Sequence, residues 1–170
     1  AAENTELTLT LDPSFEYALM PLEGFFRIDD QSFNTEALII VIGICCKIDA
    51  EAICDIALSG EEAIRIVKDN LETNVCQRSD YDLILMDCNM PIMDGYESTR
   101  RIRKLFNQMD ISLENQPKII AITGHVENEY IDRAIESGMN KVFSKPLNIK
   151  EFGQLMVDMR YITSIPDHLK

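Results

Sequence analysis

The stretch YDLILMDCNMPIMDGYESTRRIRKL, residues 81–105, decides the fold. Its first part, Tyr81–Met86, is a short apolar run that predicts a buried strand. The run ends in a lone carboxylate, Asp87, and a proline, a glycine and a polar helical segment follow. What a carboxylate at the tip of a buried strand does depends on the segments around it.

Strand and helix patterns alternate along the rest of the chain. Short apolar segments predict further strands at Phe25–Ile28, Ile53–Leu58, Lys118–Thr123 and Lys141–Phe143. Apolar residues at helical spacing predict helices at Gly60–Asn70, Glu97–Asn107, Glu127–Ser137 and Asn148–Arg160. This alternation predicts an α/β protein with a parallel sheet covered by helices on both faces.

The apolar segment Glu36–Cys46 could be either a strand or a helix by composition. If it were a strand, only Lys47–Ala52 would separate it from the strand predicted at Ile53–Leu58. A parallel crossover needs about a dozen residues, usually with a helix inside. We therefore predict the first helix at Phe33–Cys45 and the first strand at Phe25–Ile28.

Composition and charge exclude several classes of function. The chain has 170 residues, 29 acidic against 16 basic, and a formal net charge of −13, which argues against a nucleic-acid surface. Its longest apolar run, Ala37–Cys46, is shorter than the roughly 20 residues of a membrane span, so no membrane insertion is expected. An odd number of cysteines with no CxxC spacing indicates a reduced, cytoplasmic protein.

The predicted strands deliver polar side chains to one edge of the sheet. Strand ends are followed by Asp29 and Asp30, by Asp87, by Thr123, and by Ser144, Lys145 and Pro146. Function gathers at the carboxyl ends of strands in open α/β sheets. Three carboxylates in one place repel each other unless a hard divalent cation lies among them, and oxygen ligands suit Mg²⁺.

Four motifs at these strand ends carry a family resemblance. They are IDDQSFN (28–34), LILMDCNMPIMDG (83–95), IIAITG (119–124) and VFSKPL (142–147). In this order the chain resembles the receiver domain of response regulators in two-component and phosphorelay signalling, most of all the receivers of hybrid histidine kinases. The resemblance implies a flavodoxin-like, doubly wound parallel sheet of five strands in the order 2-1-3-4-5. Residues 24–160 would form the receiver domain, 1–23 an N-terminal extension or linker, and 161–170 a C-terminal tail.

The resemblance also implies a role for each site residue. Asp87 would accept a phosphoryl group from phosphohistidine, and Lys145 and Thr123 would contact that group. Asp29, Asp30, Asp87 and the backbone carbonyl of Asn89 would hold Mg²⁺. Thr123 and Phe143 would form the switch, with Phe143 moving inward. Gly95 would shape the loop after Asp87, Pro146 would follow a cis bond, and Asn89 and His125 would tune hydrolysis.

Such a domain is not a turnover enzyme by itself but catalyses its own phosphorylation and dephosphorylation. Its expected partner is a histidine kinase or a histidine phosphotransfer protein. The receiver either stands alone or shares a parent chain with a kinase domain, and the residues leave both arrangements open.

Three other functions are alternatives to an active receiver. A pseudo-receiver that acts only as a protein-interaction module is the alternative, because Arg27 would lie in an interior strand. A phosphatase of the haloacid dehalogenase type needs a second aspartate where this chain has Asn89. An FMN-binding flavodoxin is disfavoured because Asp29 and Asp30 would repel a phosphate.

Three further features have simpler interpretations. The basic residues Arg100, Arg101, Arg103 and Lys104 predict a solvated helix face in preference to a docking patch. Cys88 is interpreted as a small buried hydrophobe, and Asp94 as a turn residue beside Gly95.

Overall fold

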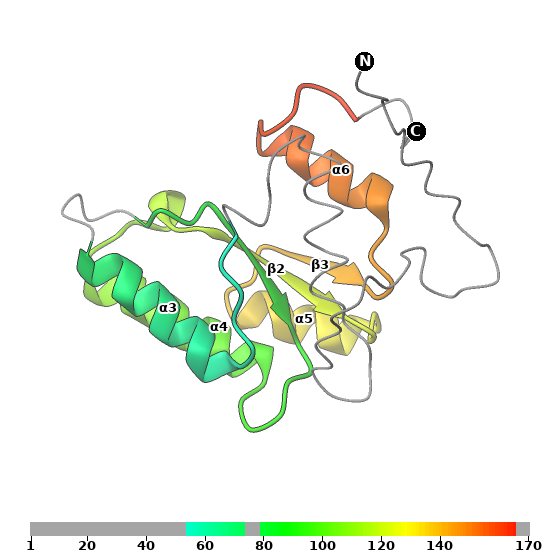
Figure 1. Ribbon diagram of the computed structural model, residues 1–170. Helices are drawn as coiled ribbons and strands as arrows, with labels where there is room; N and C mark the ends of the chain where they lie inside the picture. The colour runs from blue at the N-terminus through cyan, green and yellow to red at the C-terminus, as the bar shows by residue number, and fades with distance from the viewer. Residues whose placement is uncertain (1–53, 74–78, 166–170) are drawn as a thin grey trace, which may run out of the picture.

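The computed structural model describes residues 54–73 and 79–165, and in these ranges it contains one parallel sheet with helices around it (Figure 1). The strands are β1 (Leu83–Asp87), β2 (Lys118–Thr123) and β3 (Lys141–Ser144), in the order β1-β2-β3. The helices are α3 (Gly60–Thr73), α4 (Gly95–Gln108), α5 (Asn128–Glu136) and α6 (Ile149–Asp158), with a short 3-10 turn at Leu113–Asn115. This order corresponds to the last three strands of the predicted sheet.

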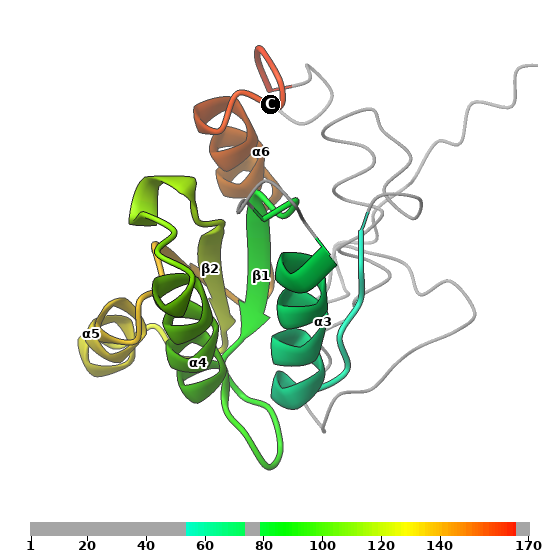
Figure 2. The ribbon, with the colours of Figure 1, turned by 90° about the vertical axis from the view of Figure 1, so that its left-hand side faces the viewer.

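Strand β2 is buried on both of its faces. Ile119 and Ala121 belong to the apolar cluster that includes residues of α3 and α4, such as Val67 and Phe106. Ile120 and Ile122 face the opposite side of the sheet, where they pack with Phe143 and with Phe152, Leu155 and Met156 of α6. Figure 2 shows α3 and α4 side by side, with α6 set apart from them. Side chains alternate along a strand, so a continuous apolar run produces two cores, one on each face.

Capping residues begin two of the helices. Asp94 accepts a hydrogen bond from the Glu97 N–H at 2.7 Å and caps α4, so the residue predicted to form a turn also starts the helix. Asn148 caps α6 by accepting hydrogen bonds from the N–H groups of Lys150 and Glu151. The structure confirms the four helices predicted at Gly60–Asn70, Glu97–Asn107, Glu127–Ser137 and Asn148–Arg160, with ends that differ by a few residues.

Arg103 corrects the prediction of a wholly solvated basic face on α4. Arg100 and Arg101 are exposed and pair with Glu97, but Arg103 is only 8% exposed. Its guanidinium donates hydrogen bonds of 2.9–3.0 Å to the carbonyl oxygens of Gly138 and Pro117 and to the side chains of Gln116 and Asn140. The charge is tolerated inside because each bond satisfies a donor that burial has taken from water. Burial also lowers the pKa of Arg103 from its ordinary value.

The predicted strand at Ile53–Leu58 is wrong for the residues that the structure describes. Cys54–Leu58 makes no strand pairing with another described segment, and Ile56 and Leu58 are each 44% exposed. The predicted neighbour of this strand, Phe25–Ile28, lies outside the described residues. The predicted helix at Phe33–Cys45 and the residues Arg27, Asp29 and Asp30 also lie outside them.

In the described part of the chain, no helix is long and apolar enough to cross a membrane. The segment after α6 stays attached to the domain, since the Tyr161 hydroxyl donates to Asp82 at 3.0 Å. Part of the predicted C-terminal tail therefore packs against the body that it follows.

Candidate active site

Asp87 is the last residue of β1, and its carboxylate is held on both oxygens. Oδ2 accepts a hydrogen bond from the Lys145 ammonium at 2.7 Å, and Oδ1 accepts one from the Asn89 N–H at 2.9 Å. The side chains of Lys145 and Asp87 are 14% and 5% exposed. A charge-assisted hydrogen bond between side chains with so little exposure to water is stronger than the same hydrogen bond on the surface. The structure therefore fixes a carboxylate and a cation at the carboxyl edge of the sheet.

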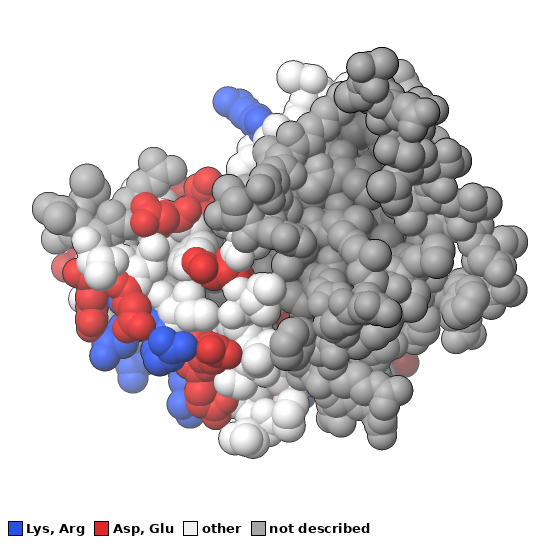
Figure 3. Space-filling model, viewed as in Figure 1, with Lys and Arg blue, Asp and Glu red and all other residues white. Residues whose placement is uncertain are grey.

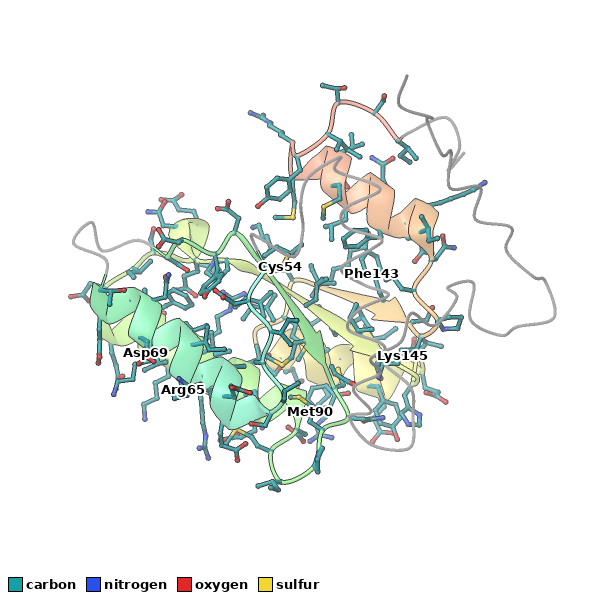
Figure 4. All side chains as sticks on the ribbon, viewed as in Figure 1. Cys54, Arg65, Asp69, Met90, Phe143 and Lys145 are labelled. Carbon is teal, nitrogen blue, oxygen red and sulfur yellow. The ribbon has the colours of Figure 1, made fainter. Side chains whose placement is uncertain are left out.

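Lys145 reaches Asp87 from the end of β3. Its backbone N–H donates to the Thr123 carbonyl at 2.7 Å, which continues the pairing between β2 and β3 by one residue. The Lys145–Pro146 peptide bond is cis, the geometry that the family resemblance implies. Figure 4 places Lys145 and Met90, from the loop after β1, at the same end of the sheet.

Thr123 and Phe143 are both buried. Thr123 ends β2 at 1% exposure, and its hydroxyl oxygen accepts the His125 N–H at 3.1 Å. Phe143 is 1% exposed, packs against α6, and has the Lys141 ammonium 4.9 Å from its ring centre (Figure 4). Phe143 is therefore part of the core that packs against α6.

Gly95 lies against the backbone of the candidate phosphoacceptor. Its N–H donates to the Cys88 carbonyl at 3.1 Å. A Cβ atom at this position would lie 2.2 Å from the carbonyl oxygen of Asp87 and 3.0 Å from its carbonyl carbon. Only a residue without a side chain allows this close approach, which places the start of α4 directly beside Asp87.

We expect Gly95→Ala to lower the free energy of unfolding by about 2 kcal/mol, because the clash is with backbone atoms that cannot rotate away. Urea denaturation measures the change. Gly153→Ala in α6 is the matched control, since the nearest atom to its added Cβ lies at 3.4 Å, an ordinary contact. Equal stabilities for the two variants would contradict the expectation.

Cys88 and Tyr96 fill the space behind the site. Cys88 is fully buried, as predicted for a small hydrophobe, and burial raises the pKa of its thiol to about 11. The thiol is therefore protonated, and unreactive as a nucleophile, at neutral pH. Tyr96 lies under the Arg133 guanidinium, which is 4.1 Å from the ring centre and bonds to Asp94 at 2.7 Å. No local sequence signal predicts this link between α5 and the start of α4, because Arg133 follows Asp94 by 39 residues.

The described residues supply oxygen donors that suit a hard metal ion. The carboxylate of Asp87 and the backbone carbonyl of Asn89 are ligands of the kind that Mg²⁺ prefers. Among residues 54–73 and 79–165, no group of three His, Cys, Asp or Glu side chains could hold a metal ion by itself. The remaining predicted ligands, Asp29 and Asp30, lie outside these ranges. The two described donors, the Asp87 carboxylate and the Asn89 carbonyl, are therefore chemically suited to Mg²⁺.

A family model for the response regulator receiver domain matches residues 27–156. The chain belongs to this family. The family match therefore confirms the predicted doubly wound α/β fold. The matched residues include all three strands that the structure describes.

Two relatives and a solved structure illustrate the similarity of this receiver to known proteins. Histidine kinase 1 of Arabidopsis thaliana is 38% identical over 104 residues, which cover 61% of this chain and 8% of the kinase. The histidine kinase CKI1 of Arabidopsis thaliana is 39% identical over 100 residues, 56% of this chain and 8% of that protein. The crystal structure of the CKI1 receiver domain complexed with Mg²⁺ and BeF₃⁻ has a TM-score of 0.54 and 30% identity. That likeness covers 72% of this chain and 84% of the solved one.

The receiver spans under a tenth of the length of these two kinases. This chain and the two kinases therefore have one domain in common. In this chain, the structure places the Asp87–Lys145 pair at the predicted edge of the sheet. Asp87, Asn89, Thr123, Phe143, Lys145 and Gly95 lie together at or beside this edge, and His125 stacks on Tyr130 with 4.7 Å between ring centres.

Proposed function

We propose that this receiver accepts a phosphoryl group on Asp87 in a His-to-Asp phosphorelay and that the transfer switches a protein-interaction face. The observation that carries the proposal is the 2.7 Å contact between the Lys145 ammonium and a nearly buried Asp87 carboxylate. A carboxylate at a strand tip that is held beside a fixed cation is prepared for a group that brings negative charge.

In the proposed reaction, a carboxylate oxygen of Asp87 forms a bond to the phosphorus of a phosphohistidine. The bond between phosphorus and the histidine nitrogen breaks, its electron pair stays on the imidazole, and the imidazole takes up a proton from solvent. Lys145 stays within reach of the phosphoryl oxygens and offsets their charge. Hydrolysis later returns Asp87 to a carboxylate and releases inorganic phosphate.

Mg²⁺ would be held by Asp87, the Asn89 carbonyl, Asp29 and Asp30, and when bound it neutralises charge on the transferring group. The neighbour solved with Mg²⁺ and BeF₃⁻ supports this assignment by similarity. The burial of Asp87 also supports a metal ion at this place, because few water molecules can reach the carboxylate to offset the charge of the transferring group.

For the switch, we propose that the Thr123 hydroxyl turns from the His125 N–H toward the new phosphoryl group. Phe143 lies one residue before Ser144, which pairs with Thr123 in the sheet. A change at Thr123 would therefore act on the packing between β3 and α6, where Phe143 is buried.

The proposed partner is a histidine kinase or a histidine phosphotransfer protein, and a kinase domain in the same parent chain is one arrangement that its relatives support. We propose a cytoplasmic location, which the cysteine pattern favours.

The proposal is tested by intact mass after incubation with acetyl phosphate and Mg²⁺. We expect a gain of one phosphoryl group, about 80 Da, that disappears in Asp87→Asn and in the presence of EDTA. No gain in the wild-type protein would overturn phosphoryl acceptance and favour a pseudo-receiver. A gain that survives in Asp87→Asn would move the acceptor to another residue.

A further inference from the structure

Arg133 of α5 holds the carboxylate that begins α4. Its guanidinium donates a hydrogen bond to Oδ2 of Asp94 at 2.7 Å, while Oδ1 of the same carboxylate caps the helix. The guanidinium also lies over the Tyr96 ring, 4.1 Å from the ring centre. Arg133 therefore contacts the residues on both sides of Gly95, the glycine that packs against the Asp87 backbone.

Gly95 connects these contacts to the loop that precedes α4. Its N–H donates to the Cys88 carbonyl at 3.1 Å and so closes the loop 89–94. The Cys88 N–H in turn donates to the Ile122 carbonyl at 3.2 Å, which ties the beginning of the loop to β2. Asn89, whose carbonyl is a proposed Mg²⁺ ligand, is the first residue of this loop. A shift of the start of α4 would therefore move the backbone that presents this oxygen.

Helix α5 is attached to the domain by few buried side chains. Of its nine residues, Ala134 alone is buried. Figure 2 shows α5 and α4 side by side, and the ion pair between Arg133 and Asp94 joins the two helices. Because α5 follows the loop after Thr123, Arg133 links the element that follows this loop to the element that follows the Asp87 loop.

The exposure of the ion pair makes it a contact that can form and break in the folded domain. The side chains of Arg133 and Asp94 are 49% and 34% exposed. Exposed ion pairs contribute little to folding stability, because water competes for both charges. The stacking on Tyr96, which is 2% exposed, adds a preferred orientation of the guanidinium. Such a contact can shift the position of α5 without deciding whether the domain folds.

We propose that Arg133 is a positioning residue for Mg²⁺, because its contacts with Asp94 and Tyr96 hold the start of α4 and thereby the Asn89 carbonyl. This inference rests on the proposed Mg²⁺ site. If Mg²⁺ binds more tightly when the contacts are made, thermodynamic linkage requires that bound Mg²⁺ also stabilises the contacts. The position of α5 and the affinity of the metal site are then coupled before any phosphoryl transfer.

The test uses Mg²⁺ alone, titrated into the full chain and followed by isothermal titration calorimetry. We expect Arg133→Gln to raise the Kd for Mg²⁺ about fivefold. The sign of the change is informative, because charge alone acts in the opposite direction. Removing a cation and freeing the Asp94 carboxylate both favour the binding of a divalent cation. A weaker affinity would therefore report the position of the ligands.

A conservative variant separates the two contacts of Arg133. Arg133→Lys keeps the charge and an ion pair with Asp94, but it removes the planar group that stacks on Tyr96. We expect this variant to recover part of the Mg²⁺ affinity that Arg133→Gln loses.

Arg65→Gln is the matched control for the loss of an exposed arginine. Arg65 in α3 is 62% exposed at its side chain and pairs with Glu62 at 3.2 Å and with Asp69 at 3.5 Å. Figure 4 places Arg65 and Asp69 away from Lys145, and Figure 3 shows basic and acidic side chains interspersed on this face. The control should leave the Kd for Mg²⁺ unchanged.

Hydrogen exchange of the α5 backbone measures the other side of the linkage. Saturating Mg²⁺ should slow exchange in peptides from residues 128–136 of the wild-type protein, because the metal ion favours the position in which Arg133 contacts Asp94. In Arg133→Gln, exchange in α5 should be faster and should respond little to Mg²⁺. Exchange in β2 should be the same in both proteins, which would show that the variant is folded.

Other outcomes would overturn the inference. A Kd for Arg133→Gln equal to or below that of the wild type would do so, and so would an equal response of α5 to Mg²⁺ in both proteins. An equal loss of affinity in Arg65→Gln would assign the effect to charge in general. No Mg²⁺ binding by the wild type would overturn the metal site and this inference with it. The first three results would leave the proposed phosphoryl acceptance intact, since that proposal fails only if acetyl phosphate and Mg²⁺ add no mass to the wild type.

Discussion

Lys145→Met is expected to slow phosphorylation by acetyl phosphate about 100-fold, the usual loss when one preorganised charge partner is removed from a reacting group. The ammonium lies 2.7 Å from Asp87, and both side chains are largely shielded from water. Methionine keeps most of the length and apolar contact of lysine but not its charge. The initial rate of mass gain at fixed acetyl phosphate and Mg²⁺ measures the effect.

The same substitution should destabilise the domain by about 3 kcal/mol, because it leaves a buried carboxylate without its cation. Adding Asp87→Asn to Lys145→Met should restore part of this loss, since the double variant removes both charges of the pair. Lys150→Met, at an exposed position in α6, serves as the control for loss of a lysine. If Lys145→Met matched Lys150→Met in rate and stability, the pair would have no role in either.

Arg103→Ala is expected to cost about 3 kcal/mol of unfolding free energy, although a helix-surface arginine would ordinarily cost almost nothing. The substitution removes four hydrogen bonds and leaves the buried carbonyl of Pro117 and the side chain of Gln116 without this donor. It also removes the packing of the Arg103 side chain on Gly138, a glycine with a φ of +101°. Urea denaturation with an unchanged m-value would measure the loss cleanly.

Arg101→Ala provides the comparison on the same helix. Arg101 is 54% exposed at its side chain and pairs with Glu97 at 2.7 Å. Exposed pairs of this kind contribute at most about 1 kcal/mol. A loss for Arg103→Ala as small as that for Arg101→Ala would show that water replaces the four hydrogen bonds without penalty.

Sequence patterns predicted the central strands and the site edge because both depend on local signals. The apolar run Lys118–Thr123 is bounded by Pro117 and by polar residues, and the strand has the predicted bounds. Asn148 predicted the start of α6 because a capping side chain acts on N–H groups two and three residues away. Asp87 ends one strand and Lys145 follows another, and both strands end at the same edge of the sheet. The topology therefore predicts that the two side chains lie close together.

The features that the sequence did not predict depend on residues that are far apart in the chain. Arg103 appeared solvated because it stands among other basic residues, yet it shares the spacing of Thr99, Ile102 and Phe106, the buried face of α4. That spacing was the available signal, and its partners lie up to 37 residues away. Cys54–Leu58 has the composition of a strand, but no strand is assigned there, and its apolar residues Ile56 and Leu58 are each 44% exposed.

The double burial of β2 has a consequence for the unfolded chain. KIIAIT combines high β-propensity with a single charge, no proline and no glycine, the composition of segments that form cross-β aggregates. In the folded domain, β1 and β3 occupy both of its edges. Once heat or a destabilising substitution releases them, six residues become a template for intermolecular pairing. Pro117 and Lys118 stand at the entrance of this segment as gatekeepers, so the residues that begin the strand also limit its misassembly.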